Sequence, residues 1–314
     1  NNTWGGHELA AFAGMQIQRN FRESSDISST IFNNDLISTF NNAAPTTITA
    51  NNSGDSRNNL YSLFTGFSYD YKGRYLVSGT FRRDGSSRFG ADNKFGYFPS
   101  FQLGWNLSKE AFLEDSNVVD NLLIRGSWGI VGNERIQDYE FTGALEPGFG
   151  YPGIDGVSGI APTRLGNTEL RWEETVSRNI GFDLTMFNRR LDINFDLWER
   201  DTDGLLSRTP LPEETGFTQI RRNVGVVRNR GLDFNIAGTI IRNKKFTWRS
   251  SFNIGLLENE VLKLSGGTPF DSGAYRVEEG QPIGNVFGYK NLGVYAYDES
   301  NAYTPDGERL TPVF

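Results

Sequence analysis

The chain has 314 residues, a formal net charge of −7 and a sequence pI near 5.0. The sequence contains no basic patch or stripe, so nucleic acid is not an expected partner. No run of residues approaches the roughly 18 apolar positions that a membrane-spanning helix needs. Cysteine is absent, which excludes disulfides, cysteine-ligated metals and thiol chemistry.

In chain order, the first predicted elements are strands with one apolar and one polar face. An alternating run follows His7, a hairpin turns at Asp70–Gly73, and two further strands lie near residues 101–107 and 122–130. Successive strand side chains point to opposite faces, so this alternation predicts strands that are apolar on one face only. Their apolar positions are Leu9, Ala11, Ala13, Met15, Ile17, Tyr61, Leu63, Phe67, Tyr69, Tyr75, Val77, Phe81, Phe101, Leu103, Trp105, Leu107, Leu122, Ile124, Trp128 and Ile130.

The second half of the chain repeats the pattern in two hairpins. The first joins residues 172–186 to 191–197 through Phe187–Arg190, and the second joins residues 232–240 to 246–256 through Arg242–Lys245. Arg178 falls on the apolar side, where an arginine at mid-membrane would cost about 2–4 kcal/mol, so we expect it near an interface. The polar positions of the first hairpin are Thr175, Ser177, Asn179, Asp183, Asp192, Asn194 and Asp196.

The predicted connections alternate between two kinds. Those near residues 70–73, 108–121, 187–190 and 242–245 are turns, whereas those near residues 83–96, 132–170, 202–222 and 259–285 are long polar loops. Periplasmic turns on one side and extracellular loops on the other are typical of bacterial outer-membrane barrels. The sequence therefore predicts an all-β fold, a transmembrane antiparallel β-barrel, over residues 1–314.

A soluble β-sandwich is the alternative fold. The mean hydropathy of −0.47 favours it superficially, but lipid-facing and lumen-facing residues cancel in such an average. The predicted strands run to roughly ten residues, as tilted membrane strands do, against about five or six in globular proteins. Because open sheet edges are not tolerated in lipid and Asn1 is not a natural start, we expect the chain to be an internal part of a larger barrel.

Catalytic and metal-binding patterns are weak. His7 is the single histidine, so a catalytic triad or a histidine-rich zinc site is not expected. Residues 148–153 match the glycine spacing of a dinucleotide loop, but Pro152 and the loop-like flanks argue against a following helix. Asp201–Gly204 resembles the start of a calcium loop without its later ligands. We therefore predict no enzyme activity and no cofactor, with Ca²⁺ on an extracellular loop as the alternative.

Several motifs, in one order, resemble those of the SusC/RagA family of TonB-dependent transporters. The first is Arg82–Gly90 followed by Gly96–Ser100. The later segments that match the family are Asn167–Glu173, Thr215–Phe217, Asn223–Gly225, Asn229–Asp233, Gly280–Gly284 and Phe287–Tyr289. Asp233 and Arg171 stand where the family often has Glu and Lys, so both positions keep their charge.

This resemblance implies a barrel of about 22 strands with a plugged lumen in the outer membrane of a Gram-negative bacterium. It implies import of oligosaccharides or peptides, energised through TonB by way of an N-terminal region absent from this chain. It also implies a SusD-like lipoprotein that covers the barrel as a lid. The alternative within the family is a barrel that serves as a scaffold in a larger outer-membrane assembly.

Two groups of residues are candidates for a site. The first is the shared motif Arg82, Arg83, Asp84, Gly85, Ser86, Ser87, Arg88, Phe89 and Gly90. We expect it to be structural, with Arg83, Asp84 and Arg88 fixing a tight turn and the glycines providing backbone freedom. The second group comprises loop aromatics that could stack on a substrate: Phe149, Tyr151, Trp172 and Tyr275. No catalytic or metal-binding residue is assigned.

Overall fold

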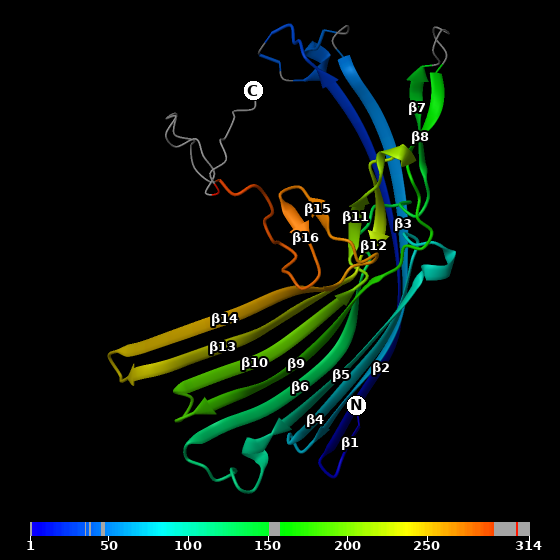
Figure 1. Ribbon diagram of the computed structural model, residues 1–314. Helices are drawn as coiled ribbons and strands as arrows, with labels where there is room; N and C mark the ends of the chain where they lie inside the picture. The colour runs from blue at the N-terminus through cyan, green and yellow to red at the C-terminus, as the bar shows by residue number, and fades with distance from the viewer. Residues whose placement is uncertain are drawn as a thin grey trace.

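The computed structural model describes residues 2–34, 36–37, 39–44, 48–150, 158–291 and 306. Ten strands form one antiparallel sheet in the order β1-β2-β3-β4-β5-β6-β9-β10-β13-β14 (Figure 1). Their bounds are β1 (Asn2–Trp4), β2 (His7–Ser29), β3 (Ile48–Tyr71), β4 (Tyr75–Ser86), β5 (Phe95–Asn106), β6 (Val119–Asn133), β9 (Glu173–Met186), β10 (Leu191–Asp203), β13 (Val226–Arg242) and β14 (Thr247–Lys263). Because β1 and β14 are its edges, the described sheet is open.

Cross-strand pairing follows the alternation of the sequence. In the β9–β10 hairpin, apolar residues face apolar residues across the strands, as in Phe182 opposite Phe195, whose rings stack 5.6 Å apart. A one-residue slip would place every apolar side chain opposite a polar one, so the pattern fixes the register. The turn between these strands spans residues 187–190, with Phe187, Asn188 and Arg189 all in the left-handed region.

The connections sort to the two ends of the sheet (Figure 1). At one end, residues 5–6, 72–74, 107–118, 187–190 and 243–246 join the strands. At the other end, the connections span residues 30–47, 87–94, 134–172 and 204–225. The contrast in length is not absolute, because residues 107–118 are longer than residues 87–94 and include the 3-10 helix η4 (Leu107–Lys109).

The long connections begin later along the chain than the sequence indicated. We expected loops over residues 83–96, 132–170, 202–222 and 259–285, but the strands run on to Ser86, Asn133, Asp203 and Lys263. Polar residues continue these strands because the backbone pairing continues beyond the apolar positions. Three small hairpins occupy the remaining loops: β7 (Ala144–Gly150) with β8 (Ser158–Arg164), β11 (Leu206–Pro210) with β12 (Gln219–Asn223), and β15 (Phe270–Ser272) with β16 (Tyr275–Val277).

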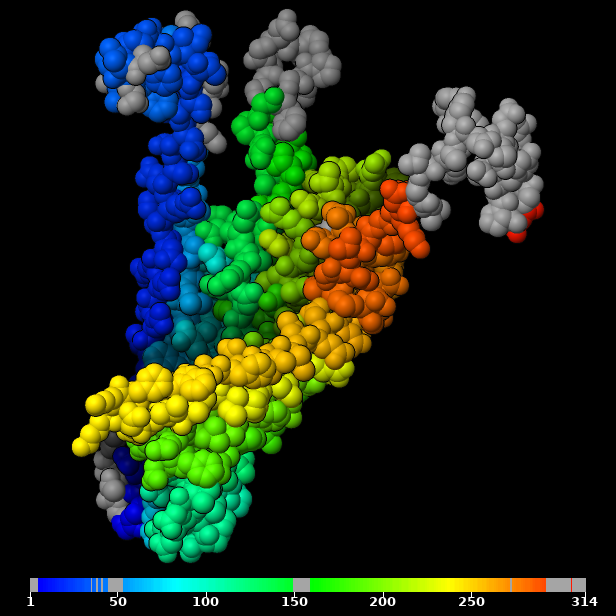
Figure 2. Space-filling view, turned by 90° about the vertical axis from the view of Figure 1, so that its left-hand side faces the viewer, coloured from blue at the N-terminus to red at the C-terminus, as the bar shows by residue number. Residues whose placement is uncertain are grey.

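Two strands extend far beyond the rest of the sheet. The pairing of β3 with β4 ends at Leu60 on the side of the long connections. Beyond that point β2 and β3 remain paired with each other, as far as Ser29 and Ile48. This two-stranded arm is about 36 Å long at roughly 3.3 Å per residue. It stands above the sheet in Figure 2, as does the β7–β8 hairpin. The sequence pattern did not predict the arm, because residues 18–29 carry little apolar alternation.

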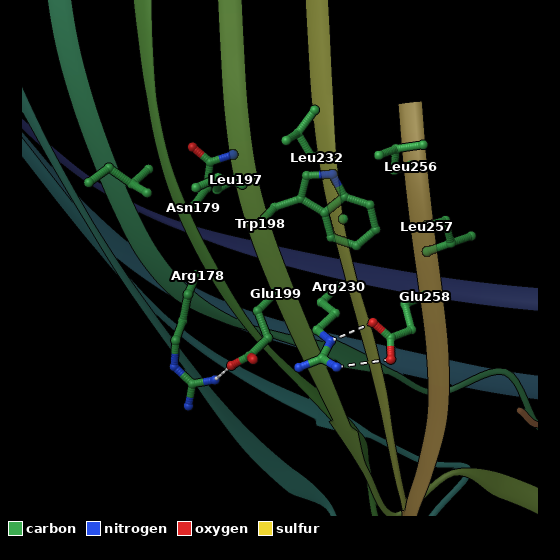
Figure 3. Close-up of a pocket in the computed structure, with 12 residues that line it drawn as sticks. Arg178, Asn179, Leu197, Trp198, Glu199, Arg230, Leu232, Leu256, Leu257 and Glu258 are labelled. Atoms are coloured by element: carbon green, nitrogen blue, oxygen red, sulfur yellow. Dashed lines mark hydrogen bonds and ion pairs between the residues drawn. The ribbon is translucent and has the colours of Figure 1, made fainter. Parts of the chain in front are cut away.

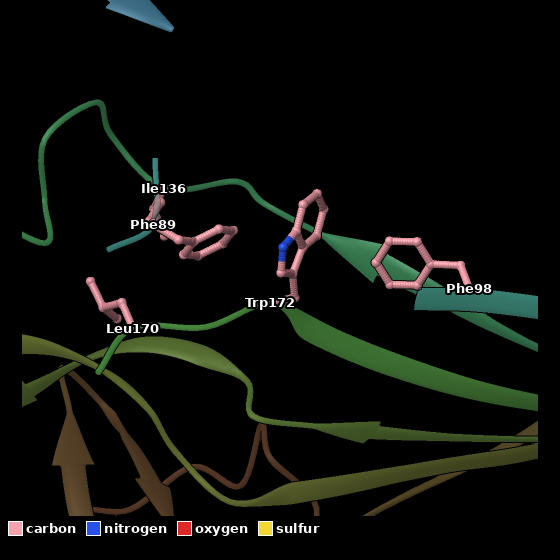
Figure 4. Close-up of a cluster of buried hydrophobic side chains, with 5 residues drawn as sticks. All are labelled: Phe89, Phe98, Ile136, Leu170 and Trp172. Carbon is pink, nitrogen blue, oxygen red and sulfur yellow. The ribbon is translucent and has the colours of Figure 1, made fainter. Parts of the chain in front are cut away.

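Two hydrophobic clusters hold the long connections together. The first consists of Phe89, Phe98, Ile136, Leu170 and Trp172 (Figure 4), and we call it the loop core. Phe89 and Leu170 are fully buried, and the Trp172 ring lies 5.3 Å from the rings of both Phe89 and Phe98. The second consists of Val227, Val261, Leu264 and Val277, with Phe270 and Ile283 packed against it.

Within the described residues, no helix has the length and apolar character required to cross a membrane.

Truncating the loop core should loosen the loops and leave the sheet intact. We expect Trp172→Ala in the full-length protein to cost about 3–5 kcal/mol locally, as large-to-small core substitutions do. The measurement is limited proteolysis, with faster cleavage predicted in residues 134–172. Phe112→Ala is the control, since Phe112 is 69% exposed at the opposite end. Equal cleavage in both variants would contradict the role of Trp172.

Candidate functional site

The strand register assigns every side chain of the sheet to one of two faces. One face carries large apolar side chains that are open to their surroundings, including Ile180, Phe252 and Leu256, each more than half exposed. The other face carries mainly polar side chains, and two of its aromatic residues, Phe12 and Phe64, lie over the glycine backbone of the neighbouring strand. Exposed apolar surface on this scale marks a contact with another apolar phase.

A single row of cross-strand neighbours changes character along the apolar face. The row crosses nine strands through Ala11, Phe67, Gly79, Phe101, Trp128, Arg178, Glu199, Arg230 and Glu258. Its first five members have no ionisable side chain, and its last four are ion-paired residues. The boundary of the apolar surface therefore runs obliquely to the rows.

The slant of that boundary can be measured. On β5 the apolar positions continue past the row for six residues towards the long connections, as far as Phe95. On β14 the last apolar position, Leu256, lies two residues from the row on the side of the turns. This is a shift of eight residues, about 26 Å, across five strand spacings of about 4.8 Å. It corresponds to a strand tilt of about 45°, close to the roughly 35–45° of outer-membrane barrels.

The apolar surface also keeps a nearly constant width, and we call it the apolar band. On β5 it spans residues 95–105, and on β14 it spans residues 248–256. These lengths of eleven and nine residues match the roughly 9–11 residues of a tilted strand that crosses a bilayer. Aromatic residues lie at its edges, including Phe95, Trp105 and Trp248.

Ion pairs begin where the band ends on β9–β14. Arg178 pairs with Glu199 at 2.8 Å, and Arg230 with Glu258 at 2.9 Å; Figure 3 shows both pairs below Leu197, Leu232 and Leu256. In the next row, Arg228 pairs with Asp201 at 2.7 Å. Half-exposed arginines at this level agree with a position in the headgroup region, where a lipid-facing charge costs only about 0–1 kcal/mol.

An arginine of β6 organises the polar face. The Arg125 guanidinium donates two hydrogen bonds of 2.7 Å to Asp196 on β10 and one of 3.0 Å to Asp183 on β9. Asn194 donates to Asp183, and Asn235 of β13 donates to Asn194. This network joins four strands, so the polar face of the wall is internally hydrogen-bonded.

The motif of residues 82–90 is not the tight turn that the sequence indicated. Arg82–Ser86 belong to β4, and only residues 87–94 form the connection. Arg82 pairs with Asp84 at 2.7 Å and reaches the buried Ser62, while Arg83 lies over the Phe95 ring at 3.9 Å on the opposite face. The expected joint role of Arg83 and Asp84 is therefore wrong, because neighbouring strand residues point to opposite faces.

The remaining motif residues connect β4 to other loops. Ser86 accepts a hydrogen bond from the Arg88 backbone, Ser87 accepts one from the Asn59 backbone, and Phe89 fills the loop core. Gly90 has an ordinary φ of −61°, so backbone freedom is not its role. A Cβ at Gly90 would lie 2.9 Å from the Thr168 carbonyl oxygen, and one at Gly85 would meet the Phe95 ring. Both glycines make room for neighbours.

Arg88 ties this motif to the β6–β9 connection. Its Nε donates to Asp138 at 2.9 Å, and Nη1 lies 3.5 Å from Glu134. Burial raises the pKa of Asp138, but hydrogen bonds from Arg88 and Asn58 outweigh burial, so the net pKa lies below its usual 3.8. Nearby, the buried Glu140 carboxylate accepts a hydrogen bond from Arg221 of β12 at 3.0 Å.

The predicted stacking aromatics have different environments. Trp172 is 5% exposed and donates from its indole Nε1 to the Lys94 carbonyl, so it has no free ring face for a substrate. The expectation that Trp172 faces substrate is therefore wrong, because packing in the loop core uses both ring faces. Tyr275 is half exposed on β16. Phe149 lies in β7, and its side chain lies outside the described part of the chain, as does the whole of Tyr151.

The acidic run near residue 201 is neutralised by arginines. Asp201 accepts hydrogen bonds from Arg228 and Arg178, and Asp203 accepts one from Arg171. Within the described ranges, no group of three or more acidic, histidine or cysteine residues is placed to hold a metal ion. His7 lies 2.7 Å from the Tyr69 hydroxyl through Nδ1, at the turn end of β2.

Sequence reasoning missed the Arg125 network and the Glu140 ion pair. Arg125 lies on the polar parity of β6, but its partners come from two later strands, so only the three-dimensional register could pair them. Glu140 and Arg221 are 81 residues apart within loops, and no local pattern connects them.

Comparison with known proteins identifies this class of structure. The family described as TonB dependent receptor-like, beta-barrel, matches residues 1–310. The chain is 48% identical to TonB-dependent receptor P39 of Formosa agariphila, over 98% of the chain and 29% of that receptor. It is 36% identical to the TonB-dependent receptor SusC of Bacteroides thetaiotaomicron, over 82% of the chain and 27% of that receptor.

Solved structures agree. The RagAB peptide importer in its closed-closed state superimposes with a TM-score of 0.80 at 26% identity, over 90% of this chain and 31% of that chain. The chain therefore belongs to the TonB-dependent receptor β-barrel family, and the predicted all-β barrel fold and SusC/RagA resemblance are confirmed. These relatives are receptors and transporters rather than enzymes, and the chain spans just under a third of their length.

Removing the Arg125 guanidinium should destabilise the wall. We expect Arg125→Met to cost about 1–3 kcal/mol, because Asp183 and Asp196 lose charged hydrogen bonds while partly buried. Arg125→Lys should lose less stability than Arg125→Met, since lysine keeps the charge but not the paired hydrogen-bond geometry. Denaturant unfolding of the full-length barrel is the measurement. Arg200→Met is the control on the same face, where the guanidinium lies over the Trp198 ring; equal losses at both sites would contradict the network.

Acid should remove the stabilising contribution of the contact between Arg88 and Asp138. The folded pKa of Asp138 is lower than its ordinary 3.8, so the contact stabilises the loop at any pH above about 4. That contribution disappears as the pH falls through the folded pKa. Hydrogen exchange of residues 134–142 should therefore accelerate below about pH 4 relative to the sheet. In Asp138→Asn the acid-dependent step should be absent; an identical step there would contradict this assignment.

Proposed function

We propose that this chain forms part of the wall of an outer-membrane importer of nutrients, in a Gram-negative bacterium. The observation that carries the proposal is the oblique apolar band, nine to eleven residues wide, on one face of a tilted antiparallel sheet. Such a band fits lipid on one side and a polar lumen on the other. The family relationship supports the same orientation.

In this proposal the turns lie in the periplasm and the long connections lie outside the cell. The polar face lines the lumen, which the full-length protein fills with a plug that receives energy through TonB. A SusD-like lipoprotein covers the mouth near the long connections. The cargo is an oligosaccharide or a peptide, the two classes that the SusC/RagA resemblance implies, and the similar RagAB structure is that of a peptide importer.

The first test is to purify the full-length protein in detergent without added ligand and identify copurifying molecules by mass spectrometry. A lid lipoprotein and a bound oligosaccharide or peptide are the expected result. Uptake of that cargo by cells should then stop when TonB is deleted. Copurification with a large surface assembly, without lid or cargo, would contradict import and favour the scaffold function.

The assignment of faces predicts opposite outcomes for neighbouring arginine substitutions on β14. Phe252 lies within the apolar band, and Ser251 lies on the polar face. We expect Phe252→Arg to destabilise the full-length barrel in lipid bilayers by about 2–4 kcal/mol. Ser251→Arg should cost less than about 1 kcal/mol, since it stays hydrated. Denaturant titration in lipid vesicles measures both, and a larger loss for Ser251→Arg would reverse the assigned faces.

A further inference from the structure

A small apolar cavity lies at the end of the sheet with the long connections. Its volume is about 230 Å³, and its floor includes Val227 of β13 and Val261 of β14, which are cross-strand partners on the polar face. The β15–β16 segment covers this region above β14 (Figure 2). In the orientation of the proposed function, the cavity therefore lies on the lumen side of the barrel mouth, where entering cargo passes.

The walls of the cavity are apolar and fixed. Leu264, Phe270 and Ile283 also line the cavity, and Val261 and Leu264 are almost wholly buried. Backbone hydrogen bonds hold the covering segment in place, from Val261 to the Gln281 carbonyl and from Gly280 to the Val261 carbonyl. Among the described lining residues, only Ser207 and Tyr275 carry polar side chains.

This chemistry selects against sugars. A sugar ring presents several hydroxyl groups, and each one buried without a partner costs about 1–3 kcal/mol. Two hydroxyl side chains cannot satisfy a ring that is buried in an aliphatic cavity. A branched aliphatic or aromatic side chain needs no such partners. The volume is sufficient, because an apolar cavity of about 150 Å³ already holds benzene.

We propose that this cavity binds one apolar side chain of a peptide cargo, an inference that rests on the proposed import function. Leucine, isoleucine and phenylalanine side chains fit its chemistry and volume. Tyr275, half exposed, borders the cavity, and is one of the loop aromatics that the sequence singled out as candidates for contact with substrate. Burying such a side chain strengthens binding roughly 10- to 100-fold over a polar side chain of similar size.

The test uses the full-length transporter with its lipoprotein, in detergent, and three fluorescein-labelled probes. They are the hexapeptides Ser-Gly-Leu-Ser-Gly-Ser and Ser-Gly-Asn-Ser-Gly-Ser, and maltohexaose. Fluorescence polarisation should show the leucine peptide binding at least 10-fold more tightly than the asparagine peptide, with maltohexaose weaker than both. Equal affinity of the two peptides, or preference for maltohexaose, would overturn the proposal.

Two matched variants test whether the preference for the leucine peptide depends on this cavity. Ser207→Phe places a ring in the cavity and should abolish the difference between the two peptides. Thr218→Phe adds the same ring beside the β11–β12 hairpin at an exposed position outside the lining, and should preserve the difference. A leucine preference that survives in correctly folded Ser207→Phe would overturn the cavity assignment.

A crosslinking measurement needs no variant. The leucine peptide carrying photo-leucine should label residues 205–207, 261–264 or 275–284 of the wild-type protein, as mapped by mass spectrometry. Labels confined to other segments would overturn the cavity assignment. Failure of the import function is distinguishable, because it would appear as loss of all TonB-dependent uptake, whereas failure of this inference leaves uptake intact without leucine selectivity.

Discussion

Every backbone N–H and C=O group that enters a hydrocarbon layer must find its hydrogen-bond partner inside the protein. In this chain the inner strands of the sheet, from β3 to β13, meet that constraint by pairing with both neighbours over most of their length, with small irregularities near Val119, Val226 and Thr239. Once the strands are paired, successive side chains along each strand necessarily point to opposite faces of the sheet. One face can then be largely apolar in the band while the other remains hydrogen-bonded and polar.

The tilt of the strands connects this alternation of side chains to the oblique course of the apolar band across the sheet. An apolar band perpendicular to the strands would leave the row from Ala11 to Glu258 uniform in character. Instead the row passes from apolar residues to ion pairs, because tilted strands leave the bilayer at different residues. The Arg178–Glu199 and Arg230–Glu258 pairs therefore lie outside the apolar layer although Trp128, in the same row, lies within it.

Above the band, segments distant in the sequence share one packed region. Phe89 and Trp172 belong to two of the family motifs, and both enter the loop core. Asn223, in a third motif, donates to the carbonyls of Arg171 and Gly204. Ile283, in a fourth, donates its backbone N–H to Asn259. Motifs that read as surface loops in the sequence are thus the parts that fix loops onto the strands.

The sequence predicted the strands whose faces differ most, such as residues 172–186 and 191–197, because period-two alternation is a local property. It could not predict the β2–β3 arm, whose outer residues are polar on both faces, or the small hairpins in the loops. It also misjudged Trp172 and Gly90, whose roles depend on contacts with Phe98 and Thr168, far away along the chain. Partners brought together only by tertiary structure leave no mark in local spacing.

The most direct test of the membrane assignment is spin-label accessibility along two strands. This chain has no cysteine, so single labelled cysteines can be introduced at residues 95–105 of β5 and 248–258 of β14, in a full-length barrel whose cysteines elsewhere are replaced by serine, in bilayers. We predict that oxygen accessibility alternates with period two, peaks at even positions on β14, and ends at Phe95 and Leu256 at equal depth. Loss of the alternation, or high water-phase accessibility at Phe252 and Ile254, would contradict a lipid-facing apolar band.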